Sequence, residues 1–79
     1  MNHYRCTRPW AYVGVPGSTD LGARQGYYRN AKTAEEAARD VQTDFPHERI
    51  DVQAWGVDGI RQGTHVGTLT CLGGWCDFL

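Results

Sequence analysis

Long apolar stretches are missing from this sequence of 79 residues, although 41% of its residues are hydrophobic. No run approaches the roughly 18 apolar residues that a membrane-spanning helix needs, and no basic segment followed by an apolar one begins the chain as a secretory leader would. A chain of this length forms one domain, here residues 1–79, with room for a single core. We therefore expect a soluble, non-membrane protein of the cytoplasm.

Cysteine is scarce, and its number, three, is odd. Small secreted proteins that depend on disulfides usually carry an even set of cysteines, so the count indicates a reducing compartment and free thiols. Cys71 and Cys76 lie on either side of Gly73-Gly74. If these glycines form a two-residue hairpin loop, the two cysteines lie directly opposite each other, with Cα atoms about 4.5 Å apart. The sequence thus predicts a buried pair of thiols, with a strained, reducible disulfide or redox site as an alternative.

A zinc site is a second alternative for the same two cysteines. It needs two further ligands, which Cys6 and either His3 or His65 would have to supply. The spacing of Cys71 and Cys76 is at the upper limit for a zinc knuckle, and the sequence has no second pair of this kind. We predict neither a metal nor a cofactor.

Catalytic motifs are missing as well. The segment 14–22, GVPGSTDLG, lacks the Lys-Ser/Thr ending and the strand–helix context of a phosphate-binding loop. Ser18 can be grouped with a histidine and an aspartate only on paper, because nothing in the sequence places such side chains together. Glu35 and Glu36 are adjacent and do not face one another on a helix. We expect the protein not to be an enzyme.

The clearest structural signal is a helix in the segment NAKTAEEAARDVQTDF. Thr33 and Glu36 have the spacing of a capping box, and acidic residues in the first turn suit the positive end of the helix dipole. The apolar positions recur at helical spacing and are mostly alanine, which lets the helix lie close to its neighbour. The pattern predicts a helix over residues 33–45 that ends before Pro46.

Strands are predicted on both sides of this helix. Residues 3–15 form a first strand that Pro9 makes an edge strand or bends, and residues 23–31 form a second. Residues 49–57 alternate, Asp58-Gly59 is a turn signal, and residues 64–72 and 75–79 form the last two strands. The predicted fold class is α+β, with an antiparallel sheet of four to five strands and one α-helix packed on one face in a ββαββ order.

The predicted hairpins also sort side chains between the two faces of the sheet. Continuing the Asp58-Gly59 hairpin pairs Val52 with His65 and Ile50 with Gly67. The face toward the helix then holds Ile50, Val52, Ala54, Leu69, Cys71, Cys76 and Phe78, together with His65. The opposite face holds Trp55, Val66, Leu72 and Trp75, and a β-bulge near Gly56 or Gly63 would exchange the faces.

Charge is distributed unevenly along the chain. Residues 1–32 carry five basic side chains and one acidic one, which gives +4, whereas residues 33–79 carry three basic and eight acidic ones, which gives −5. Such asymmetry favours an electrostatic partner. Carboxylates spaced along a rigid helix can imitate phosphates in a basic groove, although a solvated face with local ion pairs gives the same pattern. The candidate partner-binding residues are Glu35, Glu36, Asp40, Asp44, Asp51, Trp55 and Trp75.

The N-terminal part of the chain suggests a second function. Arginines that neutralise phosphates and aromatic rings that stack on bases would together bind single-stranded nucleic acid. The residues concerned are Arg5, Arg8, Trp10, Arg24, Tyr27, Tyr28 and Arg29. Alternatively, these rings fill the core of a small sheet and the arginines only keep the protein in solution.

The stretch GYYRNAKTAEEAARDV, followed by RIDVQAWG, resembles small anti-CRISPR proteins encoded by phages. The resemblance covers residues 26–57 and lies in the size and the strand–helix–hairpin layout. It implies a non-enzymatic inhibitor, acting in the host bacterial cytoplasm, that binds a CRISPR–Cas effector complex and blocks its binding of target DNA. We expect a monomer or homodimer that acts through its acidic helix face and, in addition, Trp55 and Trp75.

Overall fold

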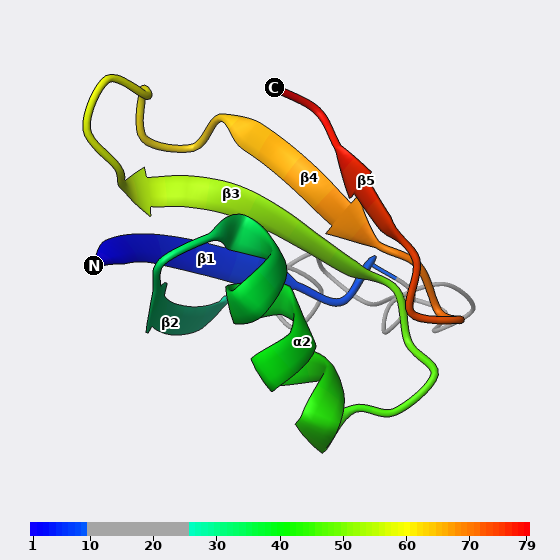
Figure 1. Ribbon diagram of the computed structural model, residues 1–79. Coiled ribbons are helices and arrows are strands. Elements are labelled where there is room, and N and C mark those ends of the chain that lie inside the picture. The colour runs from blue at the N-terminus through cyan, green and yellow to red at the C-terminus, as the bar shows by residue number, and fades with distance from the viewer. Residues whose placement is uncertain (10–25) are drawn as a thin grey trace, which may run out of the picture.

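The computed structural model describes residues 1–9 and 26–79, and these ranges form one antiparallel sheet with a helix against it (Figure 1). The sheet has five strands in the order β2-β1-β3-β4-β5. In chain order the elements are β1 (Asn2–Thr7), β2 (Tyr27–Ala31), α2 (Ala34–Asp44), β3 (Ile50–Gly56), β4 (His65–Leu69) and β5 (Trp75–Asp77). The predicted α+β class, with one helix on one face of a sheet, is confirmed for the described residues.

The helix begins and ends close to the predicted positions. Thr33 has extended backbone angles, and its hydroxyl accepts a hydrogen bond from the Glu36 amide at 3.2 Å. The Glu36 carboxylate accepts in turn from the Lys32 amide at 3.2 Å, so two otherwise unpaired donors at the helix start are satisfied. Ala37, Ala38 and Val41 are fully buried against the sheet. The predicted alanine-rich face is therefore the packed face.

The core lies between α2 and the sheet. Along β3 burial alternates as the sequence predicts, with Ile50, Val52 and Ala54 fully buried. On β1 the inward residues are Tyr4 and Cys6. The predictions for Trp10, Ser18 and Arg24 concern residues outside the described ranges.

An arginine at the end of β1 joins three parts of the chain. The Arg8 guanidinium makes a bidentate ion pair with Glu48, with the closest N–O distance 2.8 Å, and donates a hydrogen bond to the Tyr27 hydroxyl at 3.1 Å. It also lies 3.8 Å above the ring centre of Phe45. Hydrogen bonding to Glu48 raises the pKa of Arg8 above its ordinary value. Arg8 therefore ties β1, β2 and the segment between α2 and β3 together.

The prediction that Pro9 makes β1 an edge strand is wrong. β1 lies between β2 and β3. Its last paired residue is Thr7, so Pro9 follows the strand and removes no ladder hydrogen bond.

The predicted register of β3 and β4 is correct only at the tip of the hairpin. Val57 and Ile60 do bridge across Asp58-Gly59, but Ile50 pairs with Leu69 and Val52 with Gly67. A second turn near Gly63 and an irregularity at Val66 add residues on the β4 side, which moves the pairing by two positions.

The extra residue at Val66 changes which side chains face the helix at this position and before it, whereas the shift of two positions leaves Gly67 and Leu69 on their predicted face. Val66, predicted on the opposite face, is buried in the core with only 2% exposed. His65, predicted to face the core, pairs with Gln53 on the other side of the sheet. We call the side of the sheet turned away from α2 the distal face.

The predicted two-residue loop at Gly73-Gly74 is also wrong. Residues 70–74 connect β4 to β5, with Thr70 N–H bonded to the Gly74 carbonyl at 2.8 Å and Gly74 N–H bonded to the Thr70 hydroxyl at 2.9 Å. Cys76 therefore lies opposite Thr68, and Cys71 belongs to the turn. Both thiols are free and exposed, so the predicted buried thiol pair does not form. Phe78, predicted to face the helix, is on the distal face, where its ring contacts His65.

Candidate functional site

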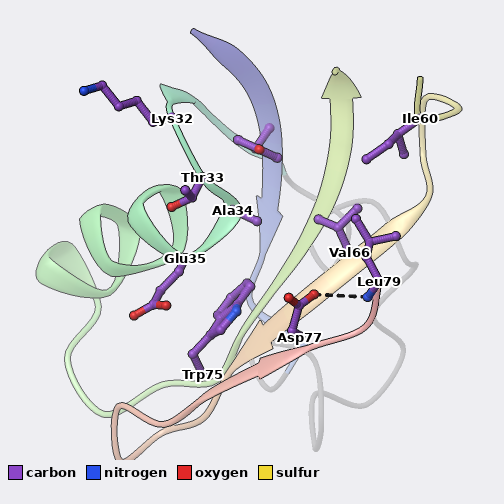
Figure 2. Close-up of a pocket in the computed structure, with 10 residues that line it drawn as sticks. Lys32, Thr33, Ala34, Glu35, Ile60, Val66, Trp75, Asp77 and Leu79 are labelled. Carbon is purple, nitrogen blue, oxygen red and sulfur yellow. Dashed lines mark hydrogen bonds between the residues drawn. The ribbon is translucent and has the colours of Figure 1, made fainter. Parts of the chain in front are cut away.

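A cleft of about 390 Å³ lies between the first turn of α2 and strand β5 (Figure 2). The helix packs mainly against β1, β2, β3 and β4. Strand β5 therefore lies outside the area that the helix covers, and at this edge the sheet is covered only by individual side chains. The cleft is lined by Tyr4, Lys32, Thr33, Ala34, Glu35, Ile60, Val66, Trp75, Asp77 and Leu79. An apolar hollow with a few charged groups at its edge is the usual form of a binding site.

Most of the lining is apolar, and its buried residues come from strands β1 and β4. Tyr4 on β1 and Val66 on β4 are buried, with 5% and 2% exposed, whereas Ala34, Ile60 and Trp75 are partly exposed. Figure 2 shows the Trp75 ring projecting from β5 toward the first turn of α2. A side chain entering the cleft would thus meet apolar groups on several sides.

Trp75 is held in this position by a glycine. Gly67 on β4 lies on the same side of the sheet, and a Cβ atom there would overlap the Trp75 six-membered ring and lie 3.0 Å from the Cys76 carbonyl oxygen. The ring therefore lies directly on the β4 backbone, which only glycine permits. This contact fixes one wall of the cleft.

Charged groups of both signs stand at the edge of the cleft. The Glu35 carboxylate pairs with Arg39 at 2.8 Å, and the Asp77 carboxylate accepts a hydrogen bond from the Leu79 amide at 3.0 Å. Lys32 is exposed, and in Figure 2 its side chain extends away from the cleft. The edge nearest Trp75 is therefore acidic.

The acidic residues predicted on the helix are largely paired with arginines. Arg29 on β2 contacts Asp40 at 2.6 Å and Asp44 at 3.5 Å, and both carboxylates remain 64% exposed. Much of the charge asymmetry along the sequence is thus compensated within the molecule. Helix α2 still carries four acidic residues against one arginine, a net −3, which Arg29 reduces to −2.

The seven candidate partner-binding residues divide among three places. Glu35 and Trp75 line the cleft. Glu36, Asp40 and Asp44 are exposed on α2. Asp51 and Trp55 belong to the distal face, where Asp51 pairs with Arg49 at 2.9 Å. Trp55 and Trp75 are on opposite sides of the sheet and do not form one patch.

Sequence reasoning missed four apolar residues of the cleft: Tyr4, Ile60, Val66 and Leu79. Val66 was placed on the wrong face because the direction of its side chain depends on the bulge in β4. Ile60 follows the predicted turn, and Leu79 follows the last strand. Only contact across the sheet brings these positions together.

The distal face carries a row of aromatic rings. His3 and Tyr28 stack with ring centres 6.0 Å apart, and Tyr28 contacts Trp55 at 5.8 Å. The Arg5 guanidinium lies 5.6 Å from the Trp55 ring centre and donates to Gln53 at 3.0 Å. A second pair, His65 and Phe78, lies toward the β5 edge with centres 4.3 Å apart. Tyr28 and Phe78 are well exposed, at 46% and 59%.

The cysteines do not come together in the described part of the chain. Cys6 is fully buried beneath the helix, and desolvation raises the pKa of its thiol to about 12. Within residues 1–9 and 26–79, no three or more His, Cys, Asp or Glu side chains are grouped so that they could hold a metal ion. The described residues therefore do not assemble the zinc ligands considered from the sequence.

Comparison with protein-family models, curated proteins and solved structures gave no match for this chain. In the described ranges, no helix combines the length and the apolar character needed to cross a membrane.

Proposed function

We propose that the protein is a non-enzymatic binding protein that inhibits a bacterial CRISPR–Cas effector complex by docking on it through the cleft beside Trp75. The occupant is an apolar or aromatic side chain of the effector, next to a basic residue. The observation that carries the proposal is the cleft itself, which is apolar, walled by an aromatic ring and acidic at its edge. The class of partner is suggested by the resemblance of residues 26–57 to small anti-CRISPR proteins in size and strand–helix–hairpin layout.

Charge favours this partner at short range. CRISPR effectors hold nucleic acid in channels rich in lysine and arginine. Glu35 stands at the cleft, whereas Asp40 and Asp44 are on the side of α2 that faces Arg29 of β2, and surface ion pairs with arginine are weak enough to be exchanged. A basic residue next to the docked side chain would therefore meet Glu35 and Asp77 at the edge of the cleft.

Trp75→Ala tests the cleft, and Trp55→Ala is its matched control on the distal face. Each purified protein is added to a panel of purified CRISPR effector complexes, and target-DNA binding is measured by mobility shift. We expect wild type to inhibit at least one effector. Loss of the aromatic wall of the cleft should raise the half-inhibitory concentration about thirtyfold, since contacts at the centre of an interface contribute on the order of 2 kcal/mol. Trp55→Ala should change it less than threefold or so.

Two further measurements make the outcome decisive. Circular dichroism melts establish that both variants are folded, and Asp40→Lys tests the acidic surface without touching the cleft. Inhibition of no effector contradicts the proposed partner. Inhibition that is unaffected by Trp75→Ala contradicts docking through the cleft, even if Asp40→Lys weakens it.

The distal face supports a second candidate, the binding of single-stranded nucleic acid. Rings on one side of an antiparallel sheet are a common platform for stacking bases, and Tyr28 is exposed between His3 and Trp55. However, the basic residues predicted to assist are divided. Arg8 and Arg29 are engaged in ion pairs on the helix side.

This candidate predicts a salt-dependent shift of a labelled oligonucleotide. Tyr28→Ala should lower the affinity about tenfold, because stacking of one base contributes roughly 1–3 kcal/mol. Trp75→Ala is the control, since that ring is on the other side of the sheet. Absence of a shift at low salt, or equal loss in both variants, would reject the distal face as the binding site.

A further inference from the structure

We infer that two copies of the protein associate through the outer edge of β5, which pairs antiparallel with β5 of the second copy. This inference does not depend on the proposed function. β5 is the last strand of the sheet, and in the described ranges only β4 pairs with it. Figure 1 shows β5 at the margin of the sheet, with the C-terminus beyond it.

The hydrogen bonds on the inner side of β5 show which of its groups remain unpaired. The Gly74 carbonyl accepts from Thr70, and the Phe78 amide donates to the Val66 carbonyl at 3.1 Å. Because the direction of backbone groups alternates along an antiparallel strand, residues 74, 76 and 78 face β4. The N–H and C=O groups of Trp75 and Asp77 therefore point outward, where an added strand would bond to them.

The sequence of β5 favours one register for its antiparallel pairing with β5 of a second copy. When Cys76 lies opposite Cys76 of the second copy, Trp75 bonds to the partner's Asp77 and Asp77 to the partner's Trp75. In this register the Asp77 carboxylates of the two copies are diagonal neighbours. If the register moves by one residue pair, the two carboxylates lie directly opposite each other, and this like-charge pair is destabilising. Phe78 falls opposite the partner's Gly74, so its ring can cover backbone that has no side chain of its own.

Exposed apolar side chains are concentrated at this edge. Of the five large hydrophobic residues that are exposed in the described ranges, three belong to the last eight residues: Leu72 at 92%, Phe78 at 59% and Leu79 at 72%. Lysine and proline, which commonly protect strand edges, do not occur in β5 or the residues after it. Pairing would thus cover backbone and apolar surface together.

The symmetry of this pairing sets the shape of the dimer. A two-fold axis perpendicular to the sheet passes between the two Cys76 residues, as in other isologous contacts. The result is a continuous ten-stranded sheet, twice the five strands of one copy, with both α2 helices on the same side. The interface is small, so we expect association in the micromolar to millimolar range.

Cys76 provides a direct test, with Cys71 as the matched control. Both thiols are exposed, but only Cys76 lies at the two-fold axis. The variants Cys71→Ser and Cys76→Ser each keep one exposed thiol. They are treated at about 100 µM with diamide, which takes up the two hydrogens released when two thiols form a disulfide. We expect the Cys76 thiol to form a covalent dimer at least tenfold faster, because Cα atoms of a non-hydrogen-bonded pair lie within disulfide range.

Asp77→Pro blocks the edge without touching the β4 ladder, since the N–H that it removes points outward; the carboxylate that accepts from the Leu79 amide is lost as well. In sedimentation velocity under reducing conditions, wild type should shift toward dimer with rising concentration, whereas folded Asp77→Pro should stay monomeric. Equal cross-linking rates at Cys71 and Cys76, a monomer at all concentrations, or a dimer that survives Asp77→Pro would each overturn the inference. Binding of a strand from another protein at this edge, without self-association, would also overturn it.

Discussion

Gly67→Ala should lower the free energy of unfolding by about 3 kcal/mol, as overpacking at a closed site does. The added methyl group would occupy the space of the Trp75 ring and press on the Cys76 carbonyl. Either the ring leaves the β4 backbone or β5 moves away from β4. Both outcomes expose Val66 and Tyr4, which are now buried. Urea denaturation followed by circular dichroism measures the change.

The same substitution in a Trp75→Ala background separates steric overlap from backbone preference. Without the ring, Gly67→Ala should cost less than about 1 kcal/mol, so the double-mutant cycle should show a coupling of roughly 2 kcal/mol. Equal costs in both backgrounds would mean that Trp75 does not lie on Gly67. The cleft would then lack the wall on which the proposed docking depends.

The three thiols should differ in reactivity by more than about a thousandfold. Cys71 and Cys76 are exposed, whereas Cys6 is fully buried and desolvation raises its pKa from 9.0 to about 12. At pH 8 the reactive thiolate of Cys6 is therefore rare as well as shielded. A chromogenic disulfide reagent should modify two thiols within minutes and the third only when urea unfolds the protein. Three equal rates would contradict the buried position of Cys6.

Burial of Cys6 also has a consequence for stability at alkaline pH. The thiol ionises near its ordinary pKa in the unfolded chain and only at much higher pH in the folded protein. The contribution of the un-ionised Cys6 thiol to the free energy of unfolding is complete below pH 9. It is lost as the pH rises toward 12, because ionisation then favours the unfolded state. Cys6→Ala should remove this part of the pH dependence.

The helix and the alternation of β3 could be predicted because their signals are local. The Thr33 cap, the alanine face and the pattern of Ile50, Val52 and Ala54 depend on residues close in sequence. The register of β4 and β5 could not be predicted in this way. It depends on turns at Gly63 and Thr70 whose hydrogen bonds, rather than the glycine pairs, decide how many residues the connections contain.

One misplaced residue in a strand reverses every side chain after it. For this reason the sequence identified Glu35 and Trp75 as binding residues but assigned Trp75 to the face of Trp55. The two-residue loop predicted at Gly73-Gly74 is the cause of that error and also placed Cys71 opposite Cys76. Val66 was placed outside the core by a separate error, the unpredicted bulge in β4. A β-strand can form in either register, but the cleft forms only if side chains from β1, β4 and β5 lie on the same side of the sheet.

The ion pairs between Arg29 and the carboxylates of α2 determine how a partner would approach. Opposite charges that lie within a few ångströms cancel at distances beyond a Debye length, which is about 8 Å in physiological salt. With a net charge of −1, the molecule exerts little long-range attraction. Association with a partner should then proceed without electrostatic steering, with rate constants on the order of 10⁵–10⁶ M⁻¹s⁻¹. Differences in affinity between partners would therefore arise mainly from their dissociation rates.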